Sequence, residues 1–293
     1  MARAHPILPF IAAAAGIATF SMMDATMKGA SIAAGVYSAL LLRCAFGTVL
    51  MLPVWLLSGA RWPATAVLRI HLLRSTVVTG MALLFFWGLV RLPIAEAIAL
   101  SFIAPLIALY LAAVVLGEII RTQAVVASLL GLSGVIIIVA ARLGGDALNE
   151  QSAWGIASVL GSAVLYAWNL VLQRQQAQIA KPQEIALFQN LLVASILGLA
   201  APWLLHWPSA SALRDIAIAA ALAGISLLLL SWAYARAEAQ ALLPIEYTGF
   251  AWAALFGWLM FGEPVGLATL AGVVLIVSGS WIAARRASQA TAL

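Results

Sequence analysis

The chain has 293 residues, of which 65% are hydrophobic and 9% are charged, and its formal net charge is +5. Because a soluble domain has roughly half apolar and a quarter charged residues, this composition excludes a water-soluble globular protein and indicates an integral membrane protein. The basic residues are scattered between apolar runs, which argues against a nucleic-acid partner. One cysteine and three widely separated histidines exclude an internal disulfide and give no metal-ligand spacing, so no metal and no cofactor are expected.

Apolar runs bounded by charged residues, Gly and Pro predict an all-α integral membrane protein with ten transmembrane helices. The first run follows a basic amino terminus that resembles a secretory signal, but the many later spans indicate an uncleaved helix. The connections are short, so no domain outside the membrane is expected. In chain order the predicted helices cover residues 8–29, 34–57, 70–90, 92–115, 122–141, 153–175, 183–205, 213–235, 240–261 and 266–284.

A shift of 145 residues aligns the two halves of the chain. It brings "WPATAVLR" from Trp62 onto "WPSASALR" from Trp207. It also aligns rare residues in pairs: Gly16 and Gly161, Asp24 and Asn169, Trp87 and Trp232, Arg91 and Arg236, Gly134 and Gly279. We therefore expect two five-helix repeats, in residues 1–145 and 146–293, within one membrane unit. Because five is odd, the second repeat enters the membrane from the opposite side, and the repeats are inverted.

Lys and Arg residues favour one side of the predicted membrane. Four lie in loops on one side, namely Lys28, Arg91, Arg142 and Arg214. Ten lie on the other side, namely Arg3, Arg61, Arg69, Arg74, Arg121, Arg174, Lys181, Arg236, Arg285 and Arg286. By the positive-inside rule both termini are expected in the cytoplasm, in a cytoplasmic (inner) membrane of the bacterial type.

Two Gly-Glu pairs occupy equivalent corners between the fourth and fifth helices of each half. They are Gly117 with Glu118 and Gly262 with Glu263. Glycine suits the left-handed residue that ends a helix, and a carboxylate can cap the helix that follows. We predict a structural role at the helix corners for all four residues, with a direct role of the two acids in transport as the alternative.

The "LLLR" of Leu40 to Arg43 and the "LGE" and "FGE" helix ends, together with the duplication, resemble the EamA type of the drug/metabolite transporter superfamily over nearly the whole chain. The resemblance implies a cavity between helices one to four and six to nine. Members tend to carry a Pro thirteen residues before each Gly-Glu acid; Pro105 fits, whereas Phe250 stands at the second position and Pro244 offers an earlier bend. The aromatic ninth helix, "LPIEYTGFAWAALFGWLMFGEP", most resembles the aromatic amino-acid exporter branch.

Charged residues inside predicted helices are the first candidates for the cavity, because a charge in the membrane needs water, an opposite charge or backbone carbonyls. Arg43 either attracts a substrate carboxylate or belongs to a structural ion pair. Glu246 is among the deepest acids and aligns with Ser101, while Asp24 is expected near the outer end of the first helix. Aromatic candidates either stack on a solute or pack against lipid and core: Phe86, Tyr166, Trp168, Tyr234 and Tyr247.

Inverted repeats suit alternating access to a shared central site. The sequence therefore predicts a secondary transporter that exports small metabolites, and the cation, acid and aromatics favour aromatic or hydrophobic amino acids. The alternative substrates are lipophilic drugs or organic cations, held by acids and aromatics alone. No nucleophile with a base is seen, so no catalytic residue and no enzyme are expected. A channel is a further alternative, from which the saturable exchange expected of two gated halves would distinguish a transporter.

The expected partners are the small-molecule substrate and the lipid bilayer, with a monomer favoured and a dimer as the alternative. Small residues at four-residue spacing, in 127–131 and 268–272, permit close helix contact. We expect them to pack the fifth and tenth helices each against its own half.

Overall fold

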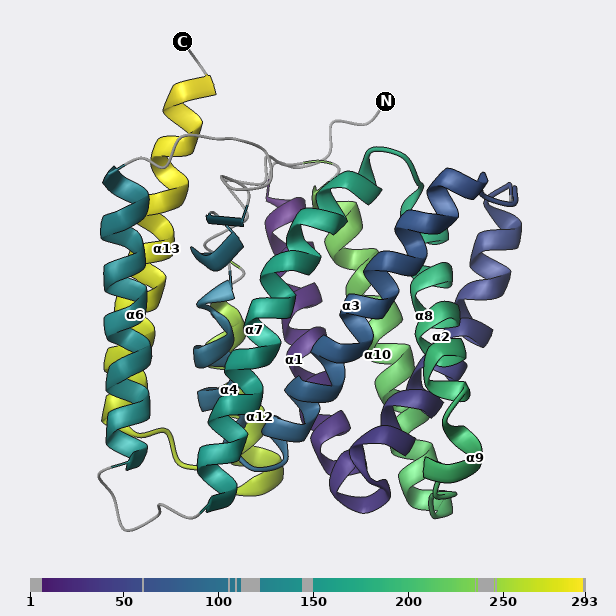
Figure 1. The fold of residues 1–293 in the computed structure, drawn as a ribbon, viewed down its shortest axis with the longest axis horizontal. Coiled ribbons are helices and arrows are strands. Elements are labelled where there is room, and N and C mark those ends of the chain that lie inside the picture. The colour runs from purple at the N-terminus through teal and green to yellow at the C-terminus, as the bar shows by residue number, and fades with distance from the viewer. Residues whose placement is uncertain are drawn as a thin grey trace.

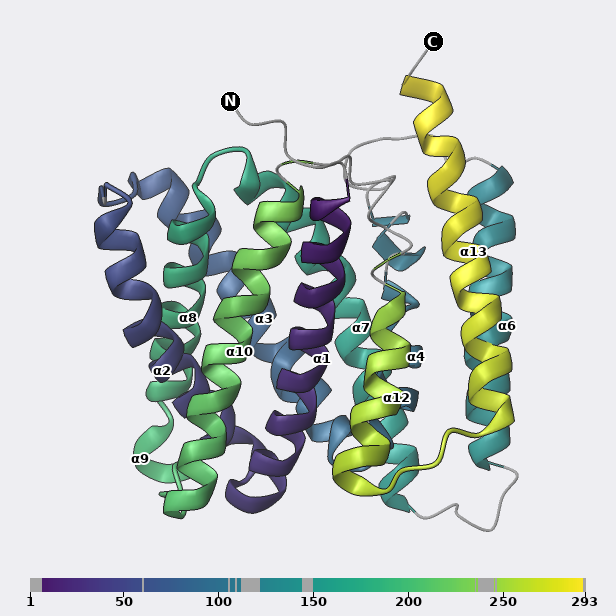
Figure 2. The ribbon, with the colours of Figure 1, turned by 180° about the vertical axis from the view of Figure 1, so that it is seen from behind.

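The computed structural model describes residues 7–59, 61–104, 106–108, 110–111, 122–143, 150–234, 236, 245 and 247–291. All regular structure in these residues is helical, which confirms the predicted fold class (Figures 1 and 2). The helices are α1 (Leu8–Ala34), α2 (Val36–Leu57), α3 (Thr65–Leu89), α4 (Ile94–Ser101), α6 (Thr122–Leu143), α7 (Glu150–Ala177), α8 (Pro182–Gly198), α9 (Ala201–Leu204), α10 (Ala210–Tyr234), α12 (Thr248–Phe261) and α13 (Leu267–Thr291).

Five of these helices are long and apolar enough to cross a membrane: α1, α2, α3, α7 and α10. Shorter apolar helices lie within α4, α6, α12 and α13. The helices lie side by side in a bundle (Figures 1 and 2). Apolar side chains fill its core, and many large apolar side chains are also exposed on its outer surface. The molecule is therefore built to lie in lipid.

Two helix boundaries differ from the sequence prediction: α1 continues to Ala34 rather than ending at residue 29, and α3 begins at Thr65 rather than at residue 70. Lys28 and Arg74, which were counted with the loop charges, therefore lie well inside these helices. Both charges are buried against polar partners, which removes the cost that would otherwise expel them to a loop. Gly35, with φ 79°, is the single residue between α1 and α2, and this backbone conformation favours glycine.

Contacts between the two halves follow the symmetry of an inverted repeat. α1 packs on α10 and α3 packs on α7, which are equivalent pairs when the halves are exchanged. α2 packs on α8, and α4 packs on α12, so each helix meets its own counterpart. α1 begins at the end of the bundle where α13 finishes, whereas α7 begins at the opposite end (Figure 1). The second repeat is therefore inverted.

The prediction for the fifth and tenth helices is wrong. α6 and α13 pack against each other across the halves, side by side at one edge of the bundle (Figures 1 and 2). A Cβ on Gly134 would lie 2.5 Å from the carbonyl oxygen of Gly272, and a Cβ on Gly272 would lie 2.7 Å from that of Gly134. These glycines bring the two backbones together, and glycine spacing does not reveal which helix will be the partner.

One apolar core runs through the bundle and includes residues of α1, α2, α3, α7 and α12. Polar and charged side chains buried within or beside this core are therefore conspicuous. They gather in two places, on α1 and between α3, α7 and α8.

Candidate functional site

A polar stripe follows one face of α1. Ser21, Asp24, Lys28 and Ser31 are spaced by three, four and three residues, which places them above one another on the helix. All four are buried. The hydroxyl of Ser21 donates to the carbonyl of Gly249 at 3.4 Å, so the stripe faces α12.

The same stripe occurs on α7. A shift of 145 residues takes the four α1 positions to Tyr166, Asn169, Gln173 and Gln176, and all four are polar. Asn169 and Gln176 are buried, whereas Tyr166 is 37% exposed. Both stripes lie in the C-terminal half of their helix. Because α1 and α7 run in opposite directions, the two stripes lie toward opposite ends of the bundle. Each repeat thus contributes one polar helix face, which is buried throughout on α1, whereas on α7 Gln173 is exposed as well as Tyr166.

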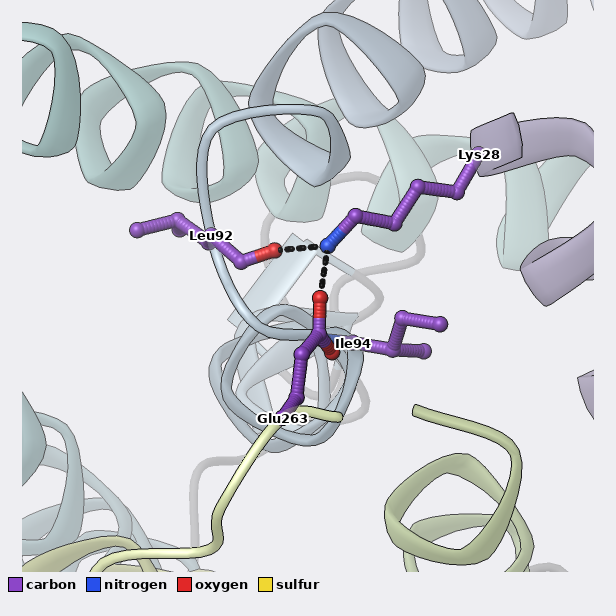
Figure 3. A network of polar contacts seen from close by, with 4 residues as sticks. All are labelled: Lys28, Leu92, Ile94 and Glu263. Atoms are coloured by element: carbon purple, nitrogen blue, oxygen red, sulfur yellow. Dashed lines mark hydrogen bonds and ion pairs between the residues drawn. The ribbon is translucent and has the colours of Figure 1, made fainter. Parts of the chain in front are cut away.

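At the far end of α1, Lys28 ties three parts of the chain together (Figure 3). Its ammonium donates to the carbonyl of Leu92 at 2.6 Å and forms an ion pair with the Glu263 carboxylate. The other oxygen of Glu263 accepts the backbone N–H of Ile94, the first residue of α4, at 2.7 Å (Figure 3). We name these four residues, Lys28, Leu92, Ile94 and Glu263, the Lys28 corner.

The Lys28 corner shows what the second Gly-Glu pair, Gly262 and Glu263, does in the structure. Gly262 ends α12 in the left-handed conformation, with φ 65° and ψ 25°. Glu263 follows it, but its carboxylate caps α4 rather than the next helix in sequence, α13. A carboxylate beside the N-terminus of α4 is stabilised by the free N–H groups and the helix dipole there. Gly117 and Glu118, the first pair, lie outside the described residues.

One turn along α1 from Lys28, Asp24 lies near Arg43 of α2, whose charge acts on its carboxylate. From the helix ends, Asp24 is about 15 Å and Arg43 about 10 Å from the connection at Gly35, so both lie well inside the membrane. Asp24 is 2% exposed, in a helix that extends ten residues beyond it, so its predicted place near the helix end is wrong.

Asp24 and Arg43 each retain a buried polar atom without a hydrogen-bond partner. These atoms are Oδ2 of Asp24 and Nε of Arg43. Nη2 of Arg43 lies 3.5 Å from Sγ of Cys44, a weak acceptor. Leaving a buried polar atom unsatisfied costs about 1 to 3 kcal/mol, and few such atoms occur in native proteins. Asp24 and Arg43 therefore each offer a buried polar atom, one an acceptor and one a donor, that the described residues leave unsatisfied.

The second polar cluster joins α3, α7 and α8. Arg74 donates from Nε to Asn169 Oδ1 at 2.8 Å, and from its terminal nitrogens to the side-chain oxygens of Gln176 and, at 3.4 Å, Gln173. Gln176 also contacts Nδ1 of His71, whose Nε2 lies 3.0 Å from the Glu184 carboxylate. We name this set, His71, Arg74, Asn169, Gln173, Gln176 and Glu184, the His71 network.

Sequence reasoning missed the His71 network and the partners of Lys28. Arg74 and Lys28 were counted with the loop charges, although both lie inside the predicted helices 70–90 and 8–29. The signal that would have found them is the repeat itself, because Lys28 and Ser31 align with Gln173 and Gln176 at the shift of 145. Four polar positions in helical register in both halves are unusual in a chain with 9% charged residues.

The remaining residues that the sequence predicted for the cavity differ in burial and in contacts. Phe86 is buried and packs edge to face on Phe85, with ring centroids 5.3 Å apart. The Ser101 hydroxyl donates to the carbonyl of Ala97 in its own helix at 2.8 Å. Trp168 is half exposed, and Tyr247 packs edge to face on Phe102 at 5.5 Å. Tyr234 ends α10, but its side chain is outside the described part of the chain, as are residues Glu246, Pro105 and Pro244.

One local contact repeats in both halves. The Arg91 guanidinium lies 3.4 Å from the ring centroid of Trp87, and that of Arg236 lies 4.3 Å from Trp232. Each arginine also donates to the carbonyl of its tryptophan, at 2.7 and 3.3 Å. The duplication is therefore visible in side-chain geometry as well as in helix packing.

Inverted repeats of apolar helices around buried charges define a multi-pass membrane protein of the secondary transporter class rather than an enzyme. The EamA-like transporter family matches the chain twice, over residues 7–140 and 153–285. The chain belongs to the EamA-like transporter family and transports small metabolites.

Characterised relatives carry different metabolites. The chain is 27% identical over 264 residues to the pseudopaline exporter CntI of Pseudomonas aeruginosa (strain UCBPP-PA14), covering 88% of this chain and 89% of the relative. It is 23% identical over 240 residues to the riboflavin transporter of Brucella anthropi, covering 79% and 82%. It is 24% identical over 235 residues to the S-adenosylmethionine uptake transporter of Rickettsia bellii, covering 79% and 78%.

A crystal structure with 21% sequence identity superposes with a TM-score of 0.64 over 95% of this chain and 98% of that chain, which shows the same fold. The three metabolite transporters give no support to the aromatic amino-acid exporter branch suggested by the ninth helix. The cargo therefore has to be argued from the residues of this chain.

Proposed function

We propose that the protein exports a small amphoteric metabolite of the amino-acid type by alternating access, with Asp24 and Arg43 as the binding residues. The observation that carries the proposal is the pair of unsatisfied atoms, Asp24 Oδ2 and Arg43 Nε, at similar depth on adjoining helices. An ammonium group suits the carboxylate, and a carboxylate suits the guanidinium. A singly charged solute would form an ion pair with at most one of the two residues.

The opposite charges of Asp24 and Arg43 also reduce the free-energy cost of burying each charge when no solute is bound. An isolated charge inside the membrane is expensive, and the attraction between an ionised Asp24 and Arg43 reduces this cost because their charges are opposite. A zwitterion is neutral, so its binding exchanges one pairing for two and adds no net charge.

The surrounding core supports a preference for apolar or aromatic side chains. Cys44, next to Arg43, belongs to the same buried cluster as Phe86 and Phe250. A hydrophobic amino-acid side chain would contact such a surface favourably. We assign Phe86 to the apolar part of the site; the roles of Ser101, Tyr166, Trp168, Tyr234, Glu246 and Tyr247 remain predictions.

The direction and the orientation are parts of the same proposal. The pseudopaline exporter is a relative over most of this chain, which supports export. Removing the buried Lys28 and Arg74 from the count of loop charges leaves nine basic residues on one side and three on the other, so the bias keeps its direction. We therefore place both termini in the cytoplasm and the Lys28 corner on the far side of the membrane.

The second candidate is transport of lipophilic organic cations, favoured by the unsatisfied carboxylate oxygen of Asp24 taken alone. Arg43 opposes this candidate because it would repel the cation. The two candidates therefore respond differently when Arg43 is neutralised.

Counterflow in liposomes tests the proposal. Purified protein is reconstituted with unlabelled phenylalanine, leucine or tetraphenylphosphonium inside, and entry of the labelled compound is followed in wild type, Asp24→Asn and Arg43→Gln. Asp215→Asn, which removes one member of an exposed ion pair with Arg214, is the matched control. We expect saturable phenylalanine counterflow that both site variants abolish and the control retains. Cation movement without amino-acid movement, or full amino-acid flux in Arg43→Gln at normal folded yield, would overturn it.

A further inference from the structure

The His71 network is a continuous chain of hydrogen bonds among buried side chains, running from Asn169 through Arg74, Gln176 and His71 to Glu184. His71 and Gln176 are 0% and 1% exposed. Phe188 stacks on the His71 ring, with centroids 5.2 Å apart and an interplanar angle of 14°. The histidine is therefore shielded from water on one face and fixed by hydrogen bonds at both ring nitrogens.

The direction of each hydrogen bond can be worked out from Arg74. A guanidinium only donates, so the Gln176 atom that faces it must be the oxygen. The amide nitrogen of Gln176 then faces Nδ1 of His71, and because an amide nitrogen only donates, Nδ1 must be the acceptor. The single proton of the ring is therefore on Nε2, where it is donated to Glu184. The network fixes His71 as the neutral Nε2–H tautomer.

A proton added to His71 would break this chain. Protonated Nδ1 would face the amide N–H groups of Gln176, so two donors would meet. Turning the Gln176 amide would only move the conflict, because its nitrogen would then face Arg74. The network therefore has two discrete states, an intact one with neutral His71 and an opened one with protonated His71 paired to Glu184.

The repeat shows that these polar residues are not needed for packing. At the shift of 145, His71 aligns with Ile216 and Arg74 with Ala219, and both counterparts are fully buried in α10. The same helix position is therefore filled by apolar side chains in the second half. Because only the first repeat has a buried histidine and arginine at these positions, we infer that these two residues serve a function other than packing the fold.

We propose that His71 is the binding site for a coupling proton, and that its protonation at Nδ1 breaks the contact with Gln176, which loosens α7 from α3 at this end of the transporter and lets it open. The inference rests on the proposed transport function. The proton enters from one side of the membrane, opens the network, and leaves on the other side as the network closes again, while the solute moves the opposite way. Transport is thus an antiport of solute against protons.

The charged and titratable surroundings of His71 within the described residues are few. Glu184 on α8 faces its Nε2, Arg74 lies one turn along on α3, and Tyr166 on α7 interacts with Arg74. Glu184 is 17% exposed at its side chain, which gives protons a route from water. The ring on the other face of His71, Phe188, is itself packed against Trp55 and Trp62, none of which carries a charge.

Proton binding can be tested without any solute, because the sequence has only three histidines. Protein labelled with ¹⁵N-histidine is titrated between about pH 8 and pH 5, the range in which histidine changes charge. His71→Gln assigns the His71 signals, and His206→Gln, which removes an exposed histidine outside the network, is the control. We expect the neutral Nε2–H tautomer at high pH and protonation of Nδ1 at low pH. A neutral Nδ1–H tautomer at high pH, or an unprotonated Nδ1 throughout, would overturn the proposal.

Coupling is tested in liposomes with labelled phenylalanine as the probe. A difference of one pH unit should accumulate phenylalanine roughly tenfold on the acidic side if one proton is exchanged per solute, since one pH unit is a factor of ten. His71→Gln should lose this accumulation and should also show slower counterflow at equal pH, because glutamine can make the same two hydrogen bonds but cannot take a proton, so the network stays closed. His206→Gln should accumulate like wild type.

The outcomes separate the two proposals. Counterflow without accumulation in wild type, or accumulation retained in His71→Gln, would overturn proton coupling at His71 and leave the transport proposal intact. Absence of all phenylalanine flux in wild type would overturn the proposed cargo, while the histidine titration would still decide whether His71 binds a proton.

Discussion

Removing the negative charge from the Lys28 corner should destabilise the protein more than removing a charge from its surface. In Glu263→Gln, the amide oxygen can still accept the N–H of Ile94, so the cap on α4 survives. What disappears is the counter-charge of Lys28, whose side chain is 5% exposed; its ammonium keeps the carbonyl of Leu92 and lies 5.2 Å from the centroid of the Phe261 ring. Breaking a buried ion pair by removing one partner costs about 3 to 5 kcal/mol, and the retained hydrogen bonds favour the lower figure.

The melting temperature of the protein in detergent, followed by tryptophan fluorescence, measures this cost. A loss of about 3 kcal/mol corresponds to a fall of roughly 6 to 12 °C in a chain of this size. Asp215→Asn is the matched control, because its pair with Arg214 is 39% and 71% exposed and such pairs contribute about 0 to 1 kcal/mol. Adding Lys28→Met to Glu263→Gln should recover part of the loss, since the buried ammonium that lost its counter-charge is then removed as well. If Glu263→Gln melted within the range of Asp215→Asn, the Lys28 corner would not be a stabilising contact.

The same melting assay checks three further changes. Gly35→Ala should lower stability by about 1 to 2 kcal/mol, because φ is 79° at this turn; an unchanged melting temperature would show that the turn can relax. Gly134→Leu should separate α6 from α13 and cost more than this, since even a Cβ would lie 2.5 Å from the carbonyl oxygen of Gly272; equal stability would mean that the two helices do not touch there. Asn169→Asp should raise stability, because it gives the buried Arg74 guanidinium a carboxylate partner in place of a neutral amide; a fall would show that the desolvation of the new charge is larger than the attraction.

The fold was accessible from the sequence because two strong signals agree. Apolar runs of membrane-spanning length identify helices, and the shift of 145 residues reveals the duplication through pairs such as Trp87 and Trp232. The inversion then follows from the odd number of helices in each repeat. None of these steps requires knowledge of which residues touch.

The errors have a common cause, which is that partners in space are not encoded at fixed sequence spacing. Lys28 looks like the end of a helix until Glu263, 235 residues away, is seen beside it. His71 and Glu184 are 113 residues apart, and neither is unusual on its own. Gly134 signals a close approach, but the sequence cannot say that Gly272 is on the other side. Arg43 was recognised because its depth could be counted along a single helix.

The claim that Asp24 and Arg43 together recognise a zwitterion is tested most directly by equilibrium binding of labelled phenylalanine to purified protein, with two analogues as competitors. Phenethylamine lacks the carboxylate and 3-phenylpropionate lacks the ammonium group, while both keep the ring. The account predicts that neither analogue competes well in wild type, and that Arg43→Gln binds phenethylamine as well as it binds phenylalanine. Equal competition by phenethylamine and phenylalanine in wild type would contradict it.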